Sequence, residues 1–380
     1  MRYLIRLSIA ITALATALLG APAVLAQAAA PTSGADHAVF TQTDDPAGNS
    51  IVSYARHDDG SLTYAATYAT GGKGGRAAGA AVDPLASQAG LVYDADHGLL
   101  LAPNAGSNTV SIFGVSGDAL HLNQVVESGG PFPASIGVNG DLAYVLDAGF
   151  AGYVQGYRIA GGKLHPITGS QRPLGLGNGN PPAFLQSPAQ VGFTPDGSKL
   201  IITMKGNGGG SVYVFGVSPD GRLSSTPTIT AVGGNAFAFV FDPAGRLVIV
   251  NAAFANLSTY AVNSDGSLSL ISAGASDRQA AACWVTVANG NYYAANAGSG
   301  SLSQYTIDGN GTVVLGQSPA ATGIPGAVDM AASSDGHFLY AQSGGSGSVK
   351  AFAVNGDGSL SPVGSWAIPD GGNQEGIAAA

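Results

Sequence analysis

Two carboxylates, Asp329 and Glu375, stand in neighbouring copies of a pattern that recurs along the chain. Each follows a glycine-rich connection and lies near the start of an apolar segment. Two such carboxylates meeting at one place could share a proton or hold a cation, so one of them could act as a general acid or base near neutral pH. Hydrogen bonding to backbone groups at a strand start is the alternative role for both residues.

Further polar and aromatic residues occur at comparable places in other copies. Arg278 precedes the apolar segment AACWV and could bind an anionic group or a carbonyl oxygen, or simply be an exposed charge on a connection. Lys205 stands where three other copies carry asparagine. Trp284 could stack on a ligand or fill the interior. Cys283 beside it behaves as a small apolar residue unless a base lowers its pKa.

The elements that must position these residues are repeated hairpins. The stretch NAGSGSLSQYTIDGNGTVVL, from residue 296, reads as strand, polar turn and strand, and six related copies occur. The central aromatics of the copies are separated by 59, 44, 58, 45, 45 and 47 residues. A period near 45 with two enlarged steps is typical of four-stranded propeller blades. The markers are Tyr54, Phe113, Tyr157, Phe215, Tyr260, Tyr305 and Phe352.

A second hairpin precedes most copies, as in VGFTPDGSKLIIT at 191 and DMAASSDGHFLYAQ at 329, so each repeat supplies four strands. The Asp-Gly and Asn-Gly pairs between apolar segments favour tight turns, because Gly and Asn tolerate positive φ. The phrases Asn263-x-Asp265-Gly266 and Asn355-x-Asp357-Gly358 could instead begin calcium loops, but neither has the ligand series that ends in Glu. We therefore interpret them as turns.

The ends of the chain complete each other. The first repeat has outer strands at about 37 to 69 but no inner strand before them, and GNQEGIAAA from 372 resembles an inner-strand opening after a complete seventh repeat. Such closure removes the exposed sheet edges of an open array. The sequence therefore predicts an all-β, seven-bladed β-propeller of four-stranded antiparallel blades over residues 37–380, closed by the C-terminal strand in blade one.

The inner strands of a propeller line its central channel. Aligning them from their turns places one residue of each strand at the same height: Gly90, Ser135, Gln190, Ala238, Trp284, Asp329 and Glu375. The loop-rich face carries both enlarged connections, with Arg76 beside Lys73 in one and Arg172 in the other. Irregular loops on a rigid scaffold are common binding sites. The ligand-binding candidates are Gln190, Lys205, Trp284, Arg76 and Arg172.

Charge and composition limit the partners. Only 10% of the residues are charged and the formal net charge is −9, which argues against binding nucleic acid or anionic membranes. Residues 1–26 read as a secretory signal peptide and 27–36 as a short linker, so we expect a secreted or periplasmic monomer without stable membrane insertion. An uncleaved anchor is the alternative. Removing residues 1–26 takes away two arginines and leaves 12 basic and 23 acidic residues, about −11.

The usual cofactor and metal signatures are missing from the sequence. The six histidines show no metal-ligand spacing, and there is no nucleophile elbow, P-loop or H-E-x-x-H motif. One cysteine excludes an internal disulfide. We expect neither a cofactor nor a dedicated metal site, although a cation in the channel stays open.

From residue 37 to 379 the chain resembles the seven-bladed propeller lactonases, a family that includes propeller-type 6-phosphogluconolactonases and carboxymuconate cyclases. The phrases VGFTPDGSKLIIT, GSVYVFGVSPDGRL and YAQSGGSGSVKAFAVNGDGSLSPV carry the resemblance. The family's suspected active-site phrase is approximately Pro-Arg-His, with a Glu at the end of the next strand. Here Pro188-Ala189-Gln190 stands in that place and Lys205 takes the position of the Glu.

Two hypotheses for function follow. The resemblance implies a lactonase-like hydrolase, in which Asp329 or Glu375 activates water and Arg278 or Lys205 polarises the carbonyl of a lactone. The missing Arg, His and Glu favour a non-catalytic propeller that binds a lactone, a carbohydrate-type ligand or an extracellular protein on its loop-rich face. A cytosolic sugar phosphate is a poor substrate for an acidic secreted protein.

Overall fold

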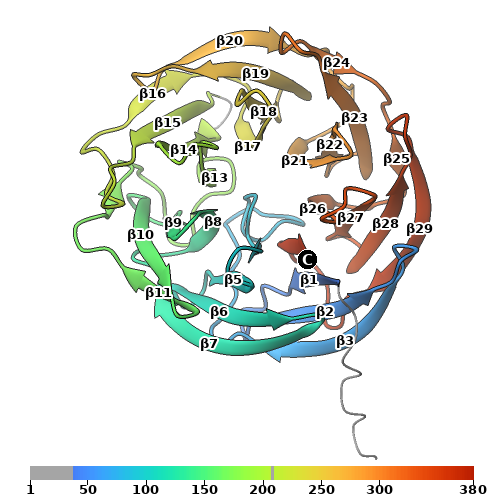
Figure 1. Cartoon of the computed structure of the whole chain (residues 1–380), viewed down its shortest axis with the longest axis horizontal. Coiled ribbons are helices and arrows are strands. Elements are labelled where there is room, and N and C mark those ends of the chain that lie inside the picture. The colour runs from blue at the N-terminus through green and yellow to red at the C-terminus, as the bar shows by residue number, and fades with distance from the viewer. Residues whose placement is uncertain (1–36, 207–208) are drawn as a thin grey trace, which may run out of the picture. The chain divides into compact units, whose positions relative to one another are not determined.

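The computed structural model describes residues 37–206 and 209–380. Its regular elements are β-strands, which form seven antiparallel sheets arranged in a ring (Figure 1). The prediction of a seven-bladed all-β propeller is confirmed. The predicted signal peptide and the linker, residues 1–26 and 27–36, lie outside the described residues. None of the described residues forms a helix long and apolar enough to cross a lipid bilayer.

Each blade is one sheet, whose strands run from the channel outward. Blade one contains β30 (Ile377–Ala379), β1 (Ala38–Gln42), β2 (Ser50–Arg56) and β3 (Leu62–Ala69). Blade two contains β4 (Val92–Asp94), β5 (Leu99–Asn104), β6 (Thr109–Ser116) and β7 (Ala119–Glu127). Blade three contains β8 (Pro133–Asn139), β9 (Leu142–Asp147), β10 (Tyr153–Ala160) and β11 (Lys163–Pro166), with β12 (Arg172–Pro173) also paired to β10.

The remaining four blades follow in chain order. Blade four contains β13 (Pro188–Phe193), β14 (Lys199–Met204), β15 (Ser211–Gly216) and β16 (Thr228–Ala231). Blade five contains β17 (Ala236–Phe241), β18 (Leu247–Asn251), β19 (Asn256–Val262) and β20 (Leu268–Ala273). Blade six contains β21 (Ala282–Ala288), β22 (Asn291–Asn296), β23 (Ser301–Ile307) and β24 (Val313–Leu315), with β25 (Ala321–Thr322) also paired to β23. Blade seven contains β26 (Ala327–Ala332), β27 (Phe338–Ser343), β28 (Ser348–Val354) and β29 (Leu360–Ala367).

The two ends of the propeller meet in blade one, as predicted. Strand β30 pairs antiparallel with β1, and Val39, Phe40 and Thr41 face Ala379, Ala378 and Ile377. The C-terminal strand thus supplies the inner strand that the N-terminal repeat lacks. This pairing covers the backbone edge of β1 that would otherwise be exposed in the channel.

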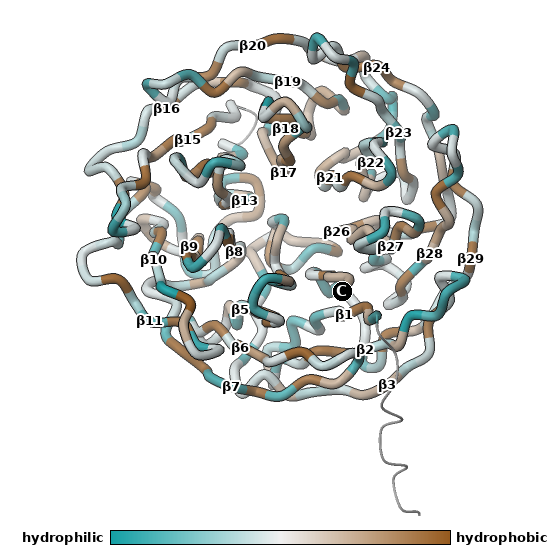
Figure 2. The backbone as a smooth tube through the Cα atoms, in the orientation of Figure 1, coloured by the Kyte–Doolittle hydropathy of each residue, from teal (hydrophilic) through white to brown (hydrophobic). Residues whose placement is uncertain are grey.

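Burial follows the position of a strand in its blade. The second strands are buried, entirely in β5 and β18 and from their second residue on in β9, because they lie between other strands and between neighbouring blades. Outer strands such as β7 alternate between inward-facing and exposed residues. Figure 2 shows the hydrophilic residues mainly in the turns and the hydrophobic stretches within the strands. The seven marker aromatics lie in the third strands and are all buried.

Tyrosine side chains join neighbouring blades. The Tyr144 hydroxyl donates to the Gly221 carbonyl at 2.6 Å, and the Tyr340 hydroxyl donates to the Gly60 carbonyl at 3.1 Å. Each bond runs from a second strand to a tight turn of the next blade. The phenol rings bury apolar area between the sheets while their hydroxyls satisfy buried carbonyls.

The turns at Asp265 and Asp357 are held by their own carboxylates. Each carboxylate accepts from the backbone N–H of the residue two positions further along the chain.

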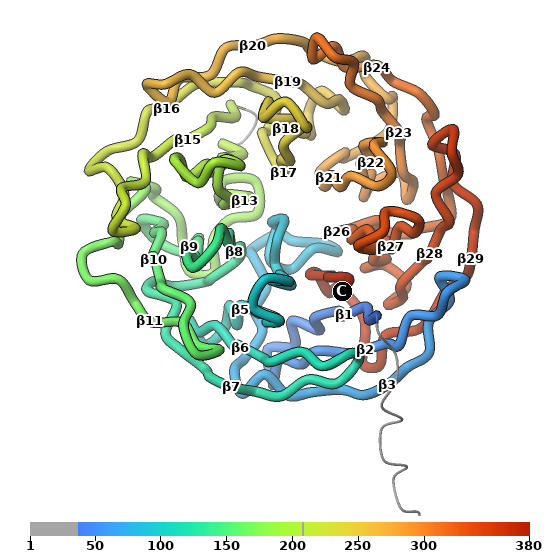
Figure 3. The backbone as a smooth tube through the Cα atoms, in the orientation of Figure 1, coloured from blue at the N-terminus to red at the C-terminus, as the bar shows by residue number. Residues whose placement is uncertain are grey.

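Both enlarged connections lie on the loop-rich face and meet there. Ala78 forms a parallel bridge with Ala183, with its N–H donating to Pro182 and its carbonyl accepting from Phe184. Residues 77–89, which we call the cover segment, then continue across the channel mouth to β4. The pale-blue trace in the middle of the ring in Figure 3 belongs to this connection.

Candidate functional site

Five of the seven residues predicted to share one height in the channel lie at equivalent positions of their inner strands, whereas Gly90 and Glu375 lie before the starts of β4 and β30. Ser135, Gln190, Ala238, Trp284 and Asp329 are each the third residue of the innermost strand of their blade. They lie near the loop-rich end of the channel, where the inner strands begin. The alignment of the repeats therefore places the candidates Gln190, Trp284 and Asp329 correctly, and their contacts decide what they can do.

Two of these residues connect successive inner strands. The Ser135 hydroxyl accepts from the Val191 N–H at 3.1 Å. The Gln190 side chain accepts from the Phe239 N–H at 2.6 Å and donates to the Phe239 carbonyl at 3.1 Å. Each side chain thus bonds the fourth residue of the next inner strand. Gln190, a ligand-binding candidate, has its amide engaged in holding blade four to blade five.

Ala238 has no polar group for the corresponding contact with blade six, and the cover segment supplies one. Gln88 donates to the Val285 carbonyl at 2.7 Å and accepts from the Val285 N–H at 3.0 Å. Its own N–H donates to the Ala189 carbonyl at 2.9 Å. Gln88 therefore links blades four and six across the channel.

Asp329 joins blade seven to the closing strand. Its Oδ1 accepts from the Met330 N–H at 2.8 Å and its Oδ2 from the Ile377 N–H at 3.2 Å. Complete burial raises the pKa of this carboxyl to about 7, and the two hydrogen bonds oppose part of the rise. The carboxyl also lines a channel cavity of about 250 Å³ together with Gln88 and Ile377.

Glu375 anchors the cover segment. Its Oε2 accepts from the N–H groups of Leu85 and Ala86, both at 3.0 Å, and its Oε1 accepts from the Ser87 N–H at 2.9 Å and the Ser87 hydroxyl at 3.2 Å. The side chain is fully buried. Burial raises the pKa of Glu375 well above its ordinary value, and the nearby carboxyls, Asp83 first among them, raise it further.

Lys205 lies beneath the cover segment. Its Nζ donates to the Ala86 carbonyl and stands 5.0 Å from the ring centroid of Phe237 and 5.4 Å from that of Phe184. Burial lowers the pKa of Lys205, and the carboxyl of Asp83 opposes this effect. The ammonium is thus held between aromatic faces and a backbone carbonyl. It has no contact with solvent that a ligand could replace.

Trp284 is committed in the same way. Its indole Nε1 donates to the Ser87 carbonyl at 2.7 Å, and its ring meets Phe237 edge to face with centroids 5.0 Å apart. The side chain is fully buried, which fits the channel-filling alternative. Cys283 next to it is also buried, and burial raises the pKa of its thiol, which disfavours the thiolate form.

Side chains from blades one, four and six therefore converge on residues 85–87 of the chain itself: Glu375 binds three N–H groups, while Lys205 and Trp284 bind carbonyls. Arg278 does not join them. It lies exposed on the connection before β21, and within the described residues it forms no ion pair with Asp329 or Glu375.

Two buried carboxyls at the mouth escaped the sequence analysis. Asp44 accepts from the Glu375 N–H at 2.8 Å and from the Gln42 amide at 2.5 Å, and burial raises its pKa to about 7. Asp83 lies in the cover segment close to Lys205, with Oδ2 unpaired, and burial raises its pKa. Both residues sit in irregular connections, where the repeat gives no register to compare.

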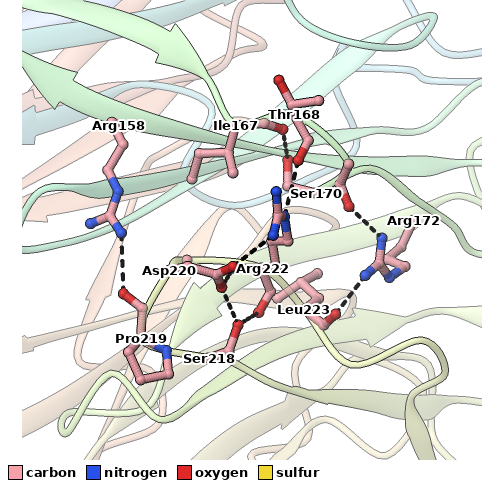
Figure 4. A network of polar contacts seen from close by, with 12 residues as sticks. Arg158, Ile167, Thr168, Ser170, Arg172, Ser218, Pro219, Asp220, Arg222 and Leu223 are labelled. Carbon is pink, nitrogen blue, oxygen red and sulfur yellow. Dashed lines mark hydrogen bonds and ion pairs between the residues drawn. The ribbon is translucent and has the colours of Figure 1, made fainter.

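Arg172 belongs to the outer rim of blades three and four. Its guanidinium donates to the carbonyls of Ser224, Leu223, Gly169 and Gln171 at 2.6 to 3.0 Å. Figure 4 shows this network, in which the neighbouring Arg222 pairs with Asp220. Arg172 thus fastens the end of blade three to a turn of blade four and does not reach the channel.

Open space remains beside the channel mouth. A pocket of about 340 Å³ lies on the loop-rich face between blades one, two and three, and both Lys73 and Arg76 line it. We call it the outer pocket; its lining is Pro46, Lys73, Gly74, Gly75, Arg76, Ala105, Gly106, Asn108, Phe132, Asn180 and Pro181. Arg76 is thus the one ligand-binding candidate that is exposed in a pocket. Among the described residues, no His, Cys, Asp and Glu side chains are grouped so as to hold a metal ion.

Solved structures with a similar fold include proteins described as lactonases. A protein from Lactobacillus plantarum matches with a TM-score of 0.71 and 15% identity, over 90% of this chain and 99% of its own. A putative 6-phosphogluconolactonase of Bacteroides fragilis matches with a TM-score of 0.66 and 15% identity, over 92% of this chain and 99% of its own. The periplasmic gluconolactonase of Pseudomonas aeruginosa matches with a TM-score of 0.68 and 14% identity, over 90% of this chain and 99% of its own. No protein-family model and no curated protein matches. The expected resemblance is confirmed as a lactonase-like propeller fold.

Proposed function

We propose that this protein is a secreted, non-catalytic propeller that binds a small polar ligand on its loop-rich face. One observation carries the proposal. Both carboxyl oxygens of Asp329 and of Glu375 accept hydrogen bonds from buried backbone N–H groups, so the candidate acids serve as structural acceptors.

Hydrolysis of a lactone needs a group that touches the attacking water and a donor for the oxyanion. The nearest candidates for these roles are occupied, because Lys205 donates to Ala86 and the Trp284 indole donates to Ser87. A substrate could reach them only after displacement of the cover segment. Ligand binding makes no such demand, since the outer pocket is open and carries two exposed cationic side chains.

Secretion is supported by the sequence of residues 1–26, which has a basic start, an apolar stretch and small residues before Gln27. A ligand in that compartment would be a small extracellular molecule. The lactone and carbohydrate-type ligands suggested by the fold are of this kind.

Lactone hydrolysis is the second candidate, favoured by one specific observation. Asp44 and Asp329 both have pKa values raised to about 7 by burial, and a carboxyl that titrates near the working pH is suited to acid–base catalysis. The gluconolactonase among the fold neighbours points in the same direction. In this candidate a substrate would reach Asp329 from the channel cavity that this residue lines, whereas contact with Lys205 or Trp284 would require opening of the cover segment.

A paired assay separates the two functions. The purified mature protein is tested with a panel of sugar and aliphatic lactones and their open hydroxy acids, with acid release followed by pH-stat and binding by calorimetry. Binding without acid release above the spontaneous rate supports the first proposal. Acid release that Asp329→Asn or Asp44→Asn abolishes in a folded protein supports the second, and Asp357→Asn in an exposed turn is the control.

A further inference from the structure

We propose that the outer pocket is a carboxylate-binding site and that its ligand is a small hydroxylated organic acid. The inference rests on the proposed function, to which it adds a location and a class of ligand. The pocket lies off the channel axis, so its ligand does not need to pass the cover segment.

The pocket wall is held in place by backbone contacts. The Lys73 N–H donates to the Ser107 hydroxyl at 2.9 Å, and the Lys73 carbonyl accepts from the Gly106 N–H at 3.0 Å. The Gly74 N–H donates to the Asp45 carbonyl at 2.9 Å. The backbone that carries both cations is thus fixed between the β1–β2 and β5–β6 loops before a ligand arrives, which reduces the entropic cost of binding.

Glycine is required for this close packing. A Cβ added to Gly74 would lie 2.1 Å from the Asp44 carbonyl oxygen, and one added to Gly106 would lie 2.1 Å from that of Gly74. The absence of side chains at these two positions lets three backbone segments meet at the base of the pocket. The Gly75 and Arg76 N–H groups make no hydrogen bond to a protein acceptor in the described part of the chain, so they can serve an anion.

The two cations that line the outer pocket are not paired with carboxylates. Two arginines elsewhere in the chain pair closely with carboxylates, Arg222 with Asp220 and Arg246 with Asp242. In residues 37–206 and 209–380, neither Lys73 nor Arg76 forms an ion pair. Arg76 donates to the Asn373 carbonyl at 3.4 Å, and its charge lowers the pKa values of the buried carboxyls of Asp44 and Asp83, against the larger effect of burial. Two unpaired positive charges in one pocket of a chain with net charge −9 favour an anionic ligand.

The remaining lining fits an organic acid better than a bare ion. Phe132 and Ala105 give the pocket an apolar base, while Asn108 and Asn180 add amides that can bond hydroxyl groups. The guanidinium can hold a carboxylate through two parallel bonds. Asp45, which precedes the lining residue Pro46, has its Oδ1 occupied by the Ala47 N–H at 2.8 Å.

Calorimetry on the mature protein tests the site, with gluconate and galacturonate as anionic probes and glucose as their neutral match. We expect both acids to bind, glucose to bind at least about tenfold more weakly, and affinity to fall as salt is raised. Arg76→Ala and Lys73→Ala should each weaken acid binding about tenfold or more, because a charge-assisted hydrogen bond is lost. Arg76→Lys should retain part of the affinity for the acids.

Lys163→Ala is the matched control, since Lys163 is an exposed cation at a tight turn of blade three on the opposite face. Acid binding unaffected by the Arg76 and Lys73 variants would overturn the carboxylate site. If a neutral lactone binds and the acids do not, the ligand class is wrong while the proposed function stands. If none of the probes or lactones binds, both proposals fail.

Discussion

Gln88 holds the backbone of Val285 at two points, donating to its carbonyl at 2.7 Å and accepting from its N–H at 3.0 Å. The same arrangement joins Gln190 to Phe239 one blade earlier. An irregular connection therefore performs the task that an inner-strand residue performs elsewhere in the ring. It does so at an interface where the strand residue, Ala238, has no polar side-chain group.

The hydrogen bonds between Gln88 and Val285 predict the effect of removing the side-chain amide of Gln88. Gln88→Ala leaves the buried N–H and carbonyl of Val285 without these partners, so we expect the free energy of unfolding to fall by about 1–3 kcal/mol. Gln190→Ala should cost a similar amount. Chemical denaturation measures both, with the exposed Gln186→Ala as the control. A Gln88→Ala protein as stable as the control would contradict the interpretation, whereas partial recovery in the double variant Gln88→Ala/Ala238→Gln would strengthen it.

The hydrogen bonds of the Glu375 carboxylate to residues 85–87 predict how strongly the cover segment is held in place. Glu375→Gln keeps the shape of the side chain but replaces one acceptor oxygen by an NH₂ group that faces backbone N–H donors. We expect amide hydrogen exchange at residues 85–87 to accelerate by about tenfold or more, because local opening becomes easier. Mass-spectrometric exchange of the native protein measures this. Exchange must stay unchanged in Asp357→Asn, and protection retained in Glu375→Gln would show that the carboxylate does not anchor the segment.

The buried carboxyls predict an unusual pH dependence. The pKa of Asp329 is raised to about 7 in the folded state from 3.8, so the folded protein binds the proton more tightly than the unfolded chain. The contribution of this group to stability is complete below about pH 4 and is lost as the pH rises towards 7, at up to about 1.4 kcal/mol per pH unit. Asp44 acts in the same direction.

Denaturation at pH 4.5 and pH 8 measures this dependence, and Asp329→Asn should flatten it. The exposed Asp196 contributes a pH dependence of the opposite sign to stability, since hydrogen bonds from Thr194 and Ser198 lower its pKa to about 2. Its contribution is therefore present above about pH 4 and is lost towards pH 2. Asp196→Asn should change stability only at the acid end, and an unaltered slope between pH 4.5 and 8 in Asp329→Asn would refute the assignment.

Closure of the ring predicts a strong effect of C-terminal truncation. Removing residues 377–380 deletes β30 and exposes the buried edge of β1, and it leaves Asp329 without its Ile377 donor. We expect a melting temperature lowered by several degrees or more and concentration-dependent association through the free edge. Calorimetry and light scattering measure these changes. Removal of Ala380 alone costs one backbone hydrogen bond and should have a small effect.

The fold could be predicted because each blade repeats the same local physics. Asp-Gly turns, alternating apolar segments and the buried marker aromatics recur with a period near 45 residues, apart from two enlarged steps, and this identifies the strands and their order. The same register correctly placed Gln190, Trp284 and Asp329 at one height in the channel. Position alone did not reveal whether these side chains face solvent.

The cover segment could not be predicted, because an aperiodic connection has no register against which its contacts can be aligned. Its partners Lys205, Trp284 and Glu375 lie in three different blades, far apart in the sequence. The roles of Asp44 and Gln88 were missed for the same reason. Arg172 and Arg76 both lie in enlarged connections, and only the tertiary packing sends one to the rim and the other to a pocket.

The meeting of β30 and β1 in one sheet has a consequence for the connectivity of the chain. Because the first and last described strands are neighbours, a short peptide can join residue 380 to residue 37, and new termini can be cut at a tight turn such as the one at Gly266. A circular permutant of this kind keeps every blade but moves the closing strand to another sheet. The order in which the blades are synthesised would then change while the ring that they form stays the same.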